Sequence, residues 1–401
     1  MREHERIAAL RDRVAQRAGA ESSSVRVIRS PYRICPLGAH VDHQLGEVTG
    51  MALDRALLFG FVPRADAVVR VESSNFPGSV EFTVHGVPEH PAGDWGDYAR
   101  GAAFALRQRG HDVRRGLFGI VDGYDNVGGL SSSAAVGVAY LLAMESASDL
   151  EVTSQENIEL DRIIENEYIG LNNGLLDQST ILLSRCGRLM YLDCESGRTA
   201  LYECGAPADV HVVVLYSGLR GQLAQTSYNR RVAECQEAAR MLLLAAGRVA
   251  GPEAKLRHVP AEAFELFKGV LPHRLRRRAE HFFSEQRRVR AGVRLWQAGN
   301  LAGFGRLISE SGRSSIENYQ CGNAYLRTAC NVLWESPGVL GARFSGAGFR
   351  GCSIGLLAGP PPPELAHDIL SRYLRARPDM RGRAEVVICR TGDGACLLAA
   401  N

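Results

Sequence analysis

The sequence predicts an α+β fold with two domains, on the strength of three observations. Strand-like and helical segments are grouped along the chain and do not alternate strictly, unlike those of a doubly wound parallel sheet. A chain of 401 residues with 45% hydrophobic residues can bury a large core and is long enough for two domains. A segment rich in glycine, proline and alanine at 196–209 precedes a new strand-like run, so we expect domains at 1–200 and 201–401.

The first half begins with strands and continues with helices. Short β-like runs separated by turn residues cover 25–30, 48–62, 67–74 and 80–84. Segments 95–110 and 131–147 space their apolar residues for one buried helix face, with strand-like GLFGIVD between them at 116–122. We expect a helix-rich stretch at 154–184 and a strand at 188–193 to complete this half.

The second half begins with strand-like VHVVVLYS. Its expected elements are a strand at 210–217, several helices over 229–335, two strands (ARFS and CSIGLLA) around a glycine-rich turn near 346–351, and a strand at 385–390. The basic stretch 271–296 also contains acids and apolar residues at helical spacing, which favours a solvated helix face over a nucleic-acid site.

Composition excludes several classes of protein. With 47 basic and 44 acidic residues the net charge is only +3, so a nucleic-acid partner is disfavoured. No apolar run is long enough for a membrane span and the start is charged and amphipathic, so we expect a cytoplasmic protein without membrane contact. The ten cysteines form neither CxxC pairs nor zinc-type clusters, which predicts reduced, partly buried thiols.

The chain contains only two lysines, Lys255 and Lys268, and neither follows a glycine-rich loop or a short apolar strand. This excludes a Walker A lysine and the strand lysine of protein kinases. If the protein binds a nucleoside triphosphate, then backbone amides, a metal ion, arginine and a helix terminus must neutralise its phosphates.

Two glycine-rich motifs lie in different halves of the chain. NVGGLSSSAA (126–135) follows a strand and opens an apolar helix, so its glycines, serines and helix dipole suit an anion, although a serine N-cap after a glycine turn explains it equally well. GARFSGAGFRGC (341–352) alone fits a flexible hairpin. Together, the two loops suggest a cleft.

Charged and polar residues complete the set of candidates. Asp177 stands in the apolar run GLLDQST, so it is either salt-bridged or catalytic. Glu165 could hold a metal ion or face solvent. PLGAHVDHQLG (36–46), just after Arg33, is dense in groups that bind sugar hydroxyls, but a polar loop with a surface arginine is the plain alternative. The combination suits phosphoryl transfer from a nucleotide to a hydroxyl.

These four segments, in this order, resemble the GHMP kinases, and most closely the galactokinase branch, from about residue 25 to the C-terminus. The galactokinase signature is roughly GRVNLIGEHTDYNGG, and this chain has YRICPLGAHVDHQLG. GGLSSSAA, GLLDQ, GARFSGAGFRGC, WGDYARGA and SYNRRVAECQEAA also match family segments. The resemblance implies a two-domain GHMP kinase fold with the active site in the cleft between the domains.

The resemblance also implies roles for individual residues. Asp177 would be the base or orienting carboxylate for the anomeric hydroxyl, and Arg33 would stabilise it and the transferring phosphoryl group. ATP and Mg²⁺ are the expected cofactors. The phosphates would be wrapped by Gly128, Gly129, Leu130, Ser131 and Ser132, Mg²⁺ would be held by Ser133 and Glu165, Trp95 would neighbour the adenine, and the sugar would be bound by His40, Asp42, Gly174 and Tyr228, with Gly346 and Gly348 in the loop that closes the cleft.

Ala39 is the most informative departure, because galactokinases have at this position a glutamate that binds the C6 hydroxyl. If the substrate carried a carboxylate at C6, two negative charges about 4 Å apart would cost about 4 kcal/mol at an effective dielectric near 20. The hydrogen bond that alanine gives up contributes only about 1 kcal/mol. Ala39 therefore fits a substrate with an acidic C6.

SPYRICPLGAH and DHQ resemble the plant-type galacturonokinases, which share this Ala-His variant. The resemblance implies ATP-dependent phosphorylation of the anomeric hydroxyl of D-galacturonic acid, a small-molecule substrate. His43, at a position usually tyrosine, is a candidate donor to the C6 carboxylate, and Arg350 could face phosphate or solvent. Two further departures from the family pattern are Tyr32, at a position that is usually glycine, and the absence of the usual proline before the phosphate loop.

Two alternatives stay open at this point. A galactokinase acting on D-galactose is the nearest, and Ala39 argues against it. A non-catalytic sugar and ATP sensor is the other, but such relatives commonly lose part of the phosphate loop or a reacting residue, whereas Arg33, Ser133, Glu165 and Asp177 are all present. The sequence makes no prediction of the oligomeric state.

Overall fold

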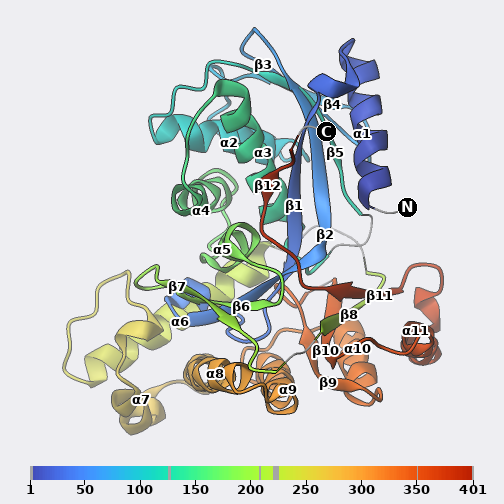
Figure 1. Ribbon diagram of the computed structural model, residues 1–401. Helices are drawn as coiled ribbons and strands as arrows, with labels where there is room; N and C mark the ends of the chain where they lie inside the picture. The colour runs from blue at the N-terminus through green and yellow to red at the C-terminus, as the bar shows by residue number, and fades with distance from the viewer. Residues whose placement is uncertain (1–2, 125–127, 207–208, 220–224, 350, 400–401) are drawn as a thin grey trace.

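The computed structural model describes residues 3–124, 128–206, 209–219, 225–349 and 351–399, and these residues form two sheets with helices packed against them (Figure 1). The strands are β1 (Arg26–Ile34), β2 (Glu47–Pro63), β3 (Val68–Ser73), β4 (Ser79–Thr83), β5 (Leu117–Asp122), β6 (Arg188–Asp193), β7 (Thr199–Glu203), β8 (Val210–Tyr216), β9 (Val339–Phe344), β10 (Cys352–Ala358), β11 (Glu385–Arg390) and β12 (Cys396–Leu397). The helices are α1 (Glu3–Ala18), α2 (Asp97–Gln108), α3 (Ser132–Ser148), α4 (Ser154–Arg162), α5 (Leu176–Leu183), α6 (Gln225–Ala245), α7 (Ala261–Phe267), α8 (His273–Gln297), α9 (Leu301–Glu317), α10 (Ala324–Trp334) and α11 (Leu365–Ala376).

The first sheet is built around the long strand β2. Its order is β12-β1-β2-β5-β3-β4, and β6 and β7 extend it from the N-terminal part of β2. The pairs are antiparallel except for β3 and β5, which run parallel. The four strands of the second sheet, in the order β11-β8-β10-β9, are all antiparallel. This mixture of grouped helices and mainly antiparallel strands confirms the predicted α+β class.

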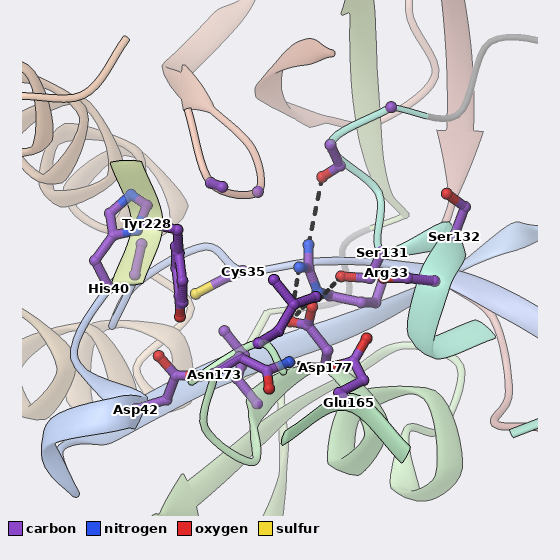
Figure 2. A pocket seen from close by; sticks show the side chains of 18 residues that line it. Arg33, Cys35, His40, Asp42, Ser131, Ser132, Glu165, Asn173, Asp177 and Tyr228 are labelled. Carbon is purple, nitrogen blue, oxygen red and sulfur yellow. Dashed lines mark hydrogen bonds and ion pairs between the residues drawn. The ribbon is translucent and has the colours of Figure 1, made fainter. Parts of the chain in front are cut away.

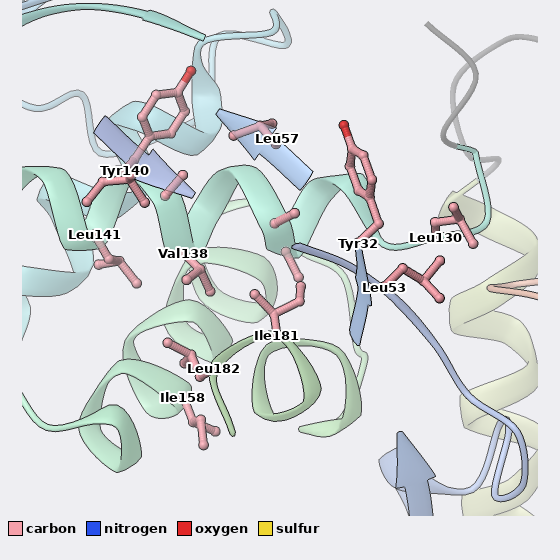
Figure 3. Close-up of a cluster of buried hydrophobic side chains, with 14 of the residues drawn as sticks. Tyr32, Leu53, Leu57, Leu130, Val138, Tyr140, Leu141, Ile158, Ile181 and Leu182 are labelled. Carbon is pink, nitrogen blue, oxygen red and sulfur yellow. The ribbon is translucent and has the colours of Figure 1, made fainter. Parts of the chain in front are cut away.

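Helix α3 is the central helix of the first half. Apolar residues surround it on every side, as expected for a helix that is buried on all faces. Its Val138 and Leu141 are fully buried in a cluster with Leu57 of β2 and with Ile158 and Ile181 of the neighbouring helices (Figure 3). The core thus fixes the direction of α3, and with it the position of the loop at its N-terminus.

The opposite face of the first sheet is covered by α1 (Figure 1). Leu10 and Val14 of α1 pack on Val27, Leu58 and other buried residues of the sheet. In the second half, α10 and α11 pack on the second sheet through Ala329, Leu333 and Ile369. Within the described residues, no helix is long and apolar enough to cross a membrane.

The C-terminal end of the described chain returns to the first sheet. The chain passes from the first sheet to the second between Glu203 and Val210, so the expected division at 200 and 201 falls inside β7. The chain then returns, because Leu397 and Cys396 of β12 pair with Ile28 and Arg29 of β1. The domain bounds predicted from the sequence did not include this returning strand.

A buried carboxylate on α8 links the second half to the loop after β1. Glu285 accepts hydrogen bonds from the backbone N–H of Gly38 (2.8 Å) and from the hydroxyl of Ser311 (2.6 Å). It also forms an ion pair with Arg288 (2.6 Å). Burial alone would raise the pKa of Glu285, but Arg288, His281, Arg343 and the Ser311 hydroxyl outweigh it and lower this pKa to about 2.

We predict that Glu285→Gln destabilises the protein by about 3 kcal/mol at pH 7, because Arg288 and Arg343 lose their buried counter-charge. A native pKa below the unfolded value of 4.5 gives stability that is present above pH 4.5 and lost as the pH falls toward 2. The difference in melting temperature between the variant and the parent protein should therefore shrink as the pH falls from 4.5 toward 2. Glu280→Gln, which removes a partly exposed pair with Arg276, is the control. Equal melting temperatures for the Glu285 variant and the parent at pH 7 would contradict the prediction.

Candidate active site

A pocket lies where the two glycine-rich loops meet the strand β1 and the helices α3 and α5 (Figure 2). Its walls come from both halves of the chain. The lining residues are Arg33, Cys35, Ala39, His40, Asp42, Gly128, Gly129, Ser131, Ser132, Ser133, Glu165, Leu171, Asn173, Leu176, Asp177, Tyr228, Gly346 and Ala347. Most of the residues expected at the site from the sequence are therefore brought together in one place.

Arg33 and Asp177 form an ion pair at the centre of the pocket. Nη2 and Nε of Arg33 lie 2.6 and 2.7 Å from the Oδ1 of Asp177. Only 4% of the Arg33 side chain is exposed, against 22% for Asp177. The pairing of β1 with β2 shifts register between Pro31 and Arg33, and such irregularities re-aim side chains. Asp177 is thus salt-bridged, which was one of the two explanations that its apolar surroundings left open.

The serine loop at the start of α3 reaches the same carboxylate. Ser131 adopts the left-handed conformation (φ 54°), which is uncommon for a serine, and its hydroxyl donates a hydrogen bond to Oδ2 of Asp177. Ser132 and Ser133 begin the helix, where free backbone N–H groups and the helix dipole favour an anion. Both oxygens of Asp177 are therefore oriented, one by Arg33 and one by Ser131.

The two glycine-rich loops pack directly against each other. A Cβ atom on Gly129 would lie 2.9 Å from the carbonyl oxygen of Ser345, and one on Gly346 would lie 2.9 Å from the Cα of Gly129. Both glycines have positive φ (91° and 71°), so a larger residue would be strained as well as crowded. The sequence suggested that these two loops face each other across a cleft. In the structure their backbones are in close contact at Gly129 and Gly346, and both loops line the pocket.

Glu165 is a buried carboxyl group beside this loop, on the π-helical segment Ile163–Tyr168. Burial and the negative charge of Asp177 raise its pKa to about 7 against the opposing effect of hydrogen bonds from Asn173 and Ser133. The Nδ2 of Asn173 donates one of these bonds. The carboxylate of Glu165 and the hydroxyl of Ser133 are hard oxygen donors, which suit Mg²⁺. Among the described residues no three His, Cys, Asp or Glu side chains form a metal cluster, so a cation here would need oxygen ligands from elsewhere, such as phosphates.

The other wall of the pocket holds the residues expected to face a sugar. Ala39 and His40 follow β1, and His40 adopts a positive φ of 62° and stacks on Tyr319 (ring centroids 4.5 Å apart). His281 on α8 donates from Nε2 to the carbonyl oxygen of Ala39 (2.9 Å) and accepts at Nδ1 from Ser314. The second half of the chain therefore fixes the backbone at Ala39.

Asp42 is buried on the same wall. Burial and the charge of Asp177 raise its pKa to about 6. The backbone N–H of Gly174 donates to its Oδ2 (3.2 Å), and a Cβ on Gly174 would lie 2.7 Å from that oxygen. Gly174 therefore holds Asp42 in place, but it is not one of the residues that line the pocket.

Among the described residues, four other predicted site residues do not line the pocket. Leu130 is a core residue whose carbonyl oxygen accepts from the backbone N–H of Arg33. Gly348 packs on Phe344 and Cys321, and Trp95 stacks on Phe76. His43 is buried, with Nε2 3.0 Å from the hydroxyl of Tyr319 and Nδ1 3.0 Å from the Nε2 of Gln44. Because both ring nitrogens have protein partners, the geometry does not support His43 as a donor to a substrate carboxylate.

Several pocket residues were not identified from the sequence. Cys35 and Leu176 are apolar neighbours of Arg33 and Asp177, and their pattern is that of ordinary core residues. Asn173 carries the hydrogen bond to Glu165, and its position immediately before GLLDQ was the only signal available. Arg350 lies outside the described residues. The ten cysteines are all free, seven of them buried.

Comparisons with known proteins agree with this geometry. The model for the GHMP kinases N terminal domain matches residues 97–185, and the model for the GHMP kinases C terminal region matches residues 293–376. A galacturonokinase of Arabidopsis thaliana is 44% identical over 97% of this chain and 97% of its own length. The chain belongs to the GHMP kinase family. A galactokinase of Roseiflexus sp. is 32% identical over 96% of the chain and 95% of its own length.

The family has a close structural match. A crystal structure of Lactococcus lactis galactokinase complexed with galactose superposes with a TM-score of 0.88 at 27% identity and covers 98% of this chain and 100% of that one. The two-domain GHMP kinase fold expected from the sequence motifs is thereby confirmed. As a member of this family, the protein is a phosphotransferase.

We predict that Asp42→Asn stabilises the substrate-free protein by up to about 2 kcal/mol at pH 8, because an ionised, buried carboxylate is replaced by a neutral amide. A native pKa of about 6, above the unfolded value of 3.8, means that ionisation of Asp42 opposes folding: the effect is absent below pH 3.8, grows as the pH rises from 3.8 to 6, and is complete above pH 6. The melting temperatures of the variant and the parent should therefore diverge between pH 4 and pH 6, and the gap should then stay constant up to pH 8. Asp149→Asn, at an exposed position, is the control. A gap that is as large at pH 4 as at pH 8 would contradict the prediction.

Proposed function

We propose that the protein is an ATP-dependent sugar-1-kinase that phosphorylates the anomeric hydroxyl of D-galacturonic acid, giving galacturonate 1-phosphate and ADP. The observation that carries this proposal is Ala39, a small apolar residue in the wall of a pocket that already contains three carboxyl groups. The 44% identity to a protein named galacturonokinase over nearly the whole chain supports it.

The charge balance of the pocket explains why alanine matters. Asp42, Glu165 and Asp177 line the pocket, against the single guanidinium of Arg33 among its lining residues. A fourth carboxylate at position 39 would repel a uronic acid by about 4 kcal/mol at 4 Å and an effective dielectric near 20, which exceeds the roughly 1 kcal/mol of a hydrogen bond to a C6 hydroxyl. Alanine removes that repulsion. His40 and Tyr228, which have hydrogen-bond donors and line the pocket, replace His43 as candidates to bind the C6 carboxylate.

Asp177 and Arg33 would perform the chemistry. Oδ1 of Asp177 faces two nitrogens of Arg33, whereas Oδ2 accepts one hydrogen bond, from Ser131, and keeps a lone pair for the anomeric hydroxyl. Asp177 takes the proton of that hydroxyl as the new O–P bond forms and the bond from the γ-phosphorus to ADP breaks. Nη1 of Arg33 also lies 3.4 Å from the carbonyl oxygen of Gly129, so its charge sits between the carboxylate and the phosphate loop. There it can stabilise the phosphoryl group in transit.

The nucleotide phosphates would be bound without lysine. Backbone N–H groups from Gly128 to Ser132 and the N-terminus of α3 supply fixed positive charge. Ser133 and Glu165 would hold Mg²⁺, with Asn173 orienting the Glu165 carboxylate. When bound, Mg²⁺ supplies charge neutralisation for the triphosphate oxygens.

An ADP-release assay with galacturonate, glucuronate and galactose side by side tests the proposal. We expect galacturonate to give the highest kcat/KM. A galactokinase would turn over galactose at least as well, and a sensor would release no ADP with any of the three sugars. Arg33, Ser133, Glu165 and Asp177 are all present, which favours an enzyme over a sensor.

We predict that Asp177→Asn lowers kcat by at least 1000-fold and leaves ATP binding within about threefold, because the amide cannot accept the proton but preserves the shape of the site. Steady-state kinetics and calorimetric titration with ATP measure the two effects. Asp149→Asn, which makes the same change at an exposed position outside the pocket lining, is the control. A near-normal kcat for Asp177→Asn would remove this residue from the chemistry.

We predict that Ala39→Glu lowers kcat/KM for galacturonate at least tenfold, because it restores the repelling carboxylate. Ala39→Gln is the matched control, since it adds the same volume without the charge and should lose less activity. Galactose turnover should rise in Ala39→Glu relative to galacturonate. If both variants lose galacturonate activity equally, crowding and not charge determines the specificity.

A further inference from the structure

Two consecutive residues of β1 hold the chain on either side of the glycines that precede α3. The backbone N–H of Arg33 donates to the carbonyl oxygen of Leu130 (3.2 Å), just before the helix. The hydroxyl of Tyr32 accepts from the backbone N–H of Tyr124 (3.3 Å), which stands four residues before Gly128. Tyr32 and Leu130 lie at the same end of α3 (Figure 3). The chain is thus attached to β1 both before and after the glycines of the phosphate loop.

Tyr32 offers its hydroxyl at a fixed position. The side chain is buried in the main core cluster, and its ring and that of Tyr124 have centroids 6.3 Å apart. The family pattern usually has glycine at position 32, and a glycine has no side chain that could accept this hydrogen bond. The proline that usually restricts the chain before the phosphate loop is also absent here. Contacts of Tyr124 can therefore supply the restriction that a proline would give.

The ring of Tyr124 contacts two guanidinium groups. The Cζ atoms of Arg6 and Arg55 lie 4.2 and 4.6 Å from the centroid of this ring, which are distances of cation–π contacts. Arg6 also shares a hydrogen bond with the side chain of Tyr124. Arg6 belongs to α1 and Arg55 to β2, so two further elements besides β1 hold this residue.

Both guanidinium groups are themselves held in place. Arg6 is buried, and its Nε and Nη2 donate to Oδ2 of Asp122 at the end of β5 (3.2 and 2.8 Å). Arg55 shares a hydrogen bond with the thiol of Cys389 on β11. Tyr124 is therefore connected to the N-terminal helix, to the first sheet and, through Arg55, to the second sheet.

We propose that Tyr32 and Tyr124 are positioning residues that fix the phosphate loop for binding the triphosphate. The proposal rests on the proposed function, which assigns this loop to the phosphates of ATP. A loop that presents several N–H groups to phosphates binds more weakly when its backbone must first be ordered, because ordering the chain costs entropy. The hydroxyl of Tyr32 and the ring of Tyr124 restrict the chain before the nucleotide binds.

Calorimetric titration of the full chain with ATP, inorganic tripolyphosphate and galacturonate tests the role of Tyr32. Tyr32→Phe removes only the hydroxyl. We expect the Kd for ATP and for tripolyphosphate to rise about fivefold, as for the loss of one neutral hydrogen bond, with the Kd for galacturonate unchanged within twofold. Tyr140→Phe makes the same change at another buried tyrosine of the main core, so it is the matched control and should leave all three constants unchanged.

The same titrations test the ring of Tyr124. Tyr124→Ala keeps the backbone N–H but loses both guanidinium contacts, and we expect it to raise the Kd for ATP and for tripolyphosphate at least tenfold. Tyr124→Phe keeps the ring and should restore both affinities to within threefold of the parent protein. Arg13→Ala, which removes a more exposed arginine of α1 that also contacts Asp122, is the control and should change neither affinity.

Unchanged affinity for tripolyphosphate in Tyr32→Phe and Tyr124→Ala would overturn the proposal. So would an equal loss of affinity for galacturonate, or an equal loss in Tyr140→Phe, since either would indicate general damage to the fold. If the parent protein binds ATP and tripolyphosphate but does not phosphorylate galacturonate, the proposed function fails, and the titrations still decide whether the two tyrosines position the loop. If the parent protein binds neither ATP nor tripolyphosphate, both proposals fail.

Discussion

The ion pair between Arg33 and Asp177 is the interaction on which the site depends. It joins a strand of the first sheet to the first turn of α5, and both side chains are largely withdrawn from solvent. Each charge compensates the other, because an unpaired charge in such a place costs free energy. The serine loop and the glycine loop of the second half are then arranged around this pair, through Ser131 on one side and the contact of Gly129 with Gly346 on the other.

If the absence of a carboxylate at position 39 is to distinguish one sugar from another, the backbone there must be rigid. Alanine leaves space beside the sugar, and in a mobile loop other side chains could move into that space. Here the carbonyl oxygen of Ala39 and the N–H of Gly38 are both held by α8, through His281 and Glu285. The second half of the chain therefore contributes to sugar recognition without presenting these two side chains to the pocket.

Local patterns predicted the fold class, most elements and most of the residues that the structure brings together in the pocket. Asp177 was recognisable because a carboxylate in an apolar run must have a partner, and the two glycine loops because of their composition. The pairing of β12 with β1 was not predictable, since it joins segments more than 360 residues apart through two residues. The contacts of His43 with Tyr319 and Gln44 were also not predictable, because a short polar loop has no periodicity that indicates which side chains line a pocket.

The returning strand β12 has a consequence for how the protein is made. Its residues complete the edge of the sheet at β1, the same strand that carries Arg33. During synthesis the ribosome must pass residue 397 before that edge is covered, and until then β1 exposes unpaired backbone groups that favour aggregation. In a nascent chain, the edge of β1 at Ile28 and Arg29 is therefore covered only after nearly all of the described residues have been translated.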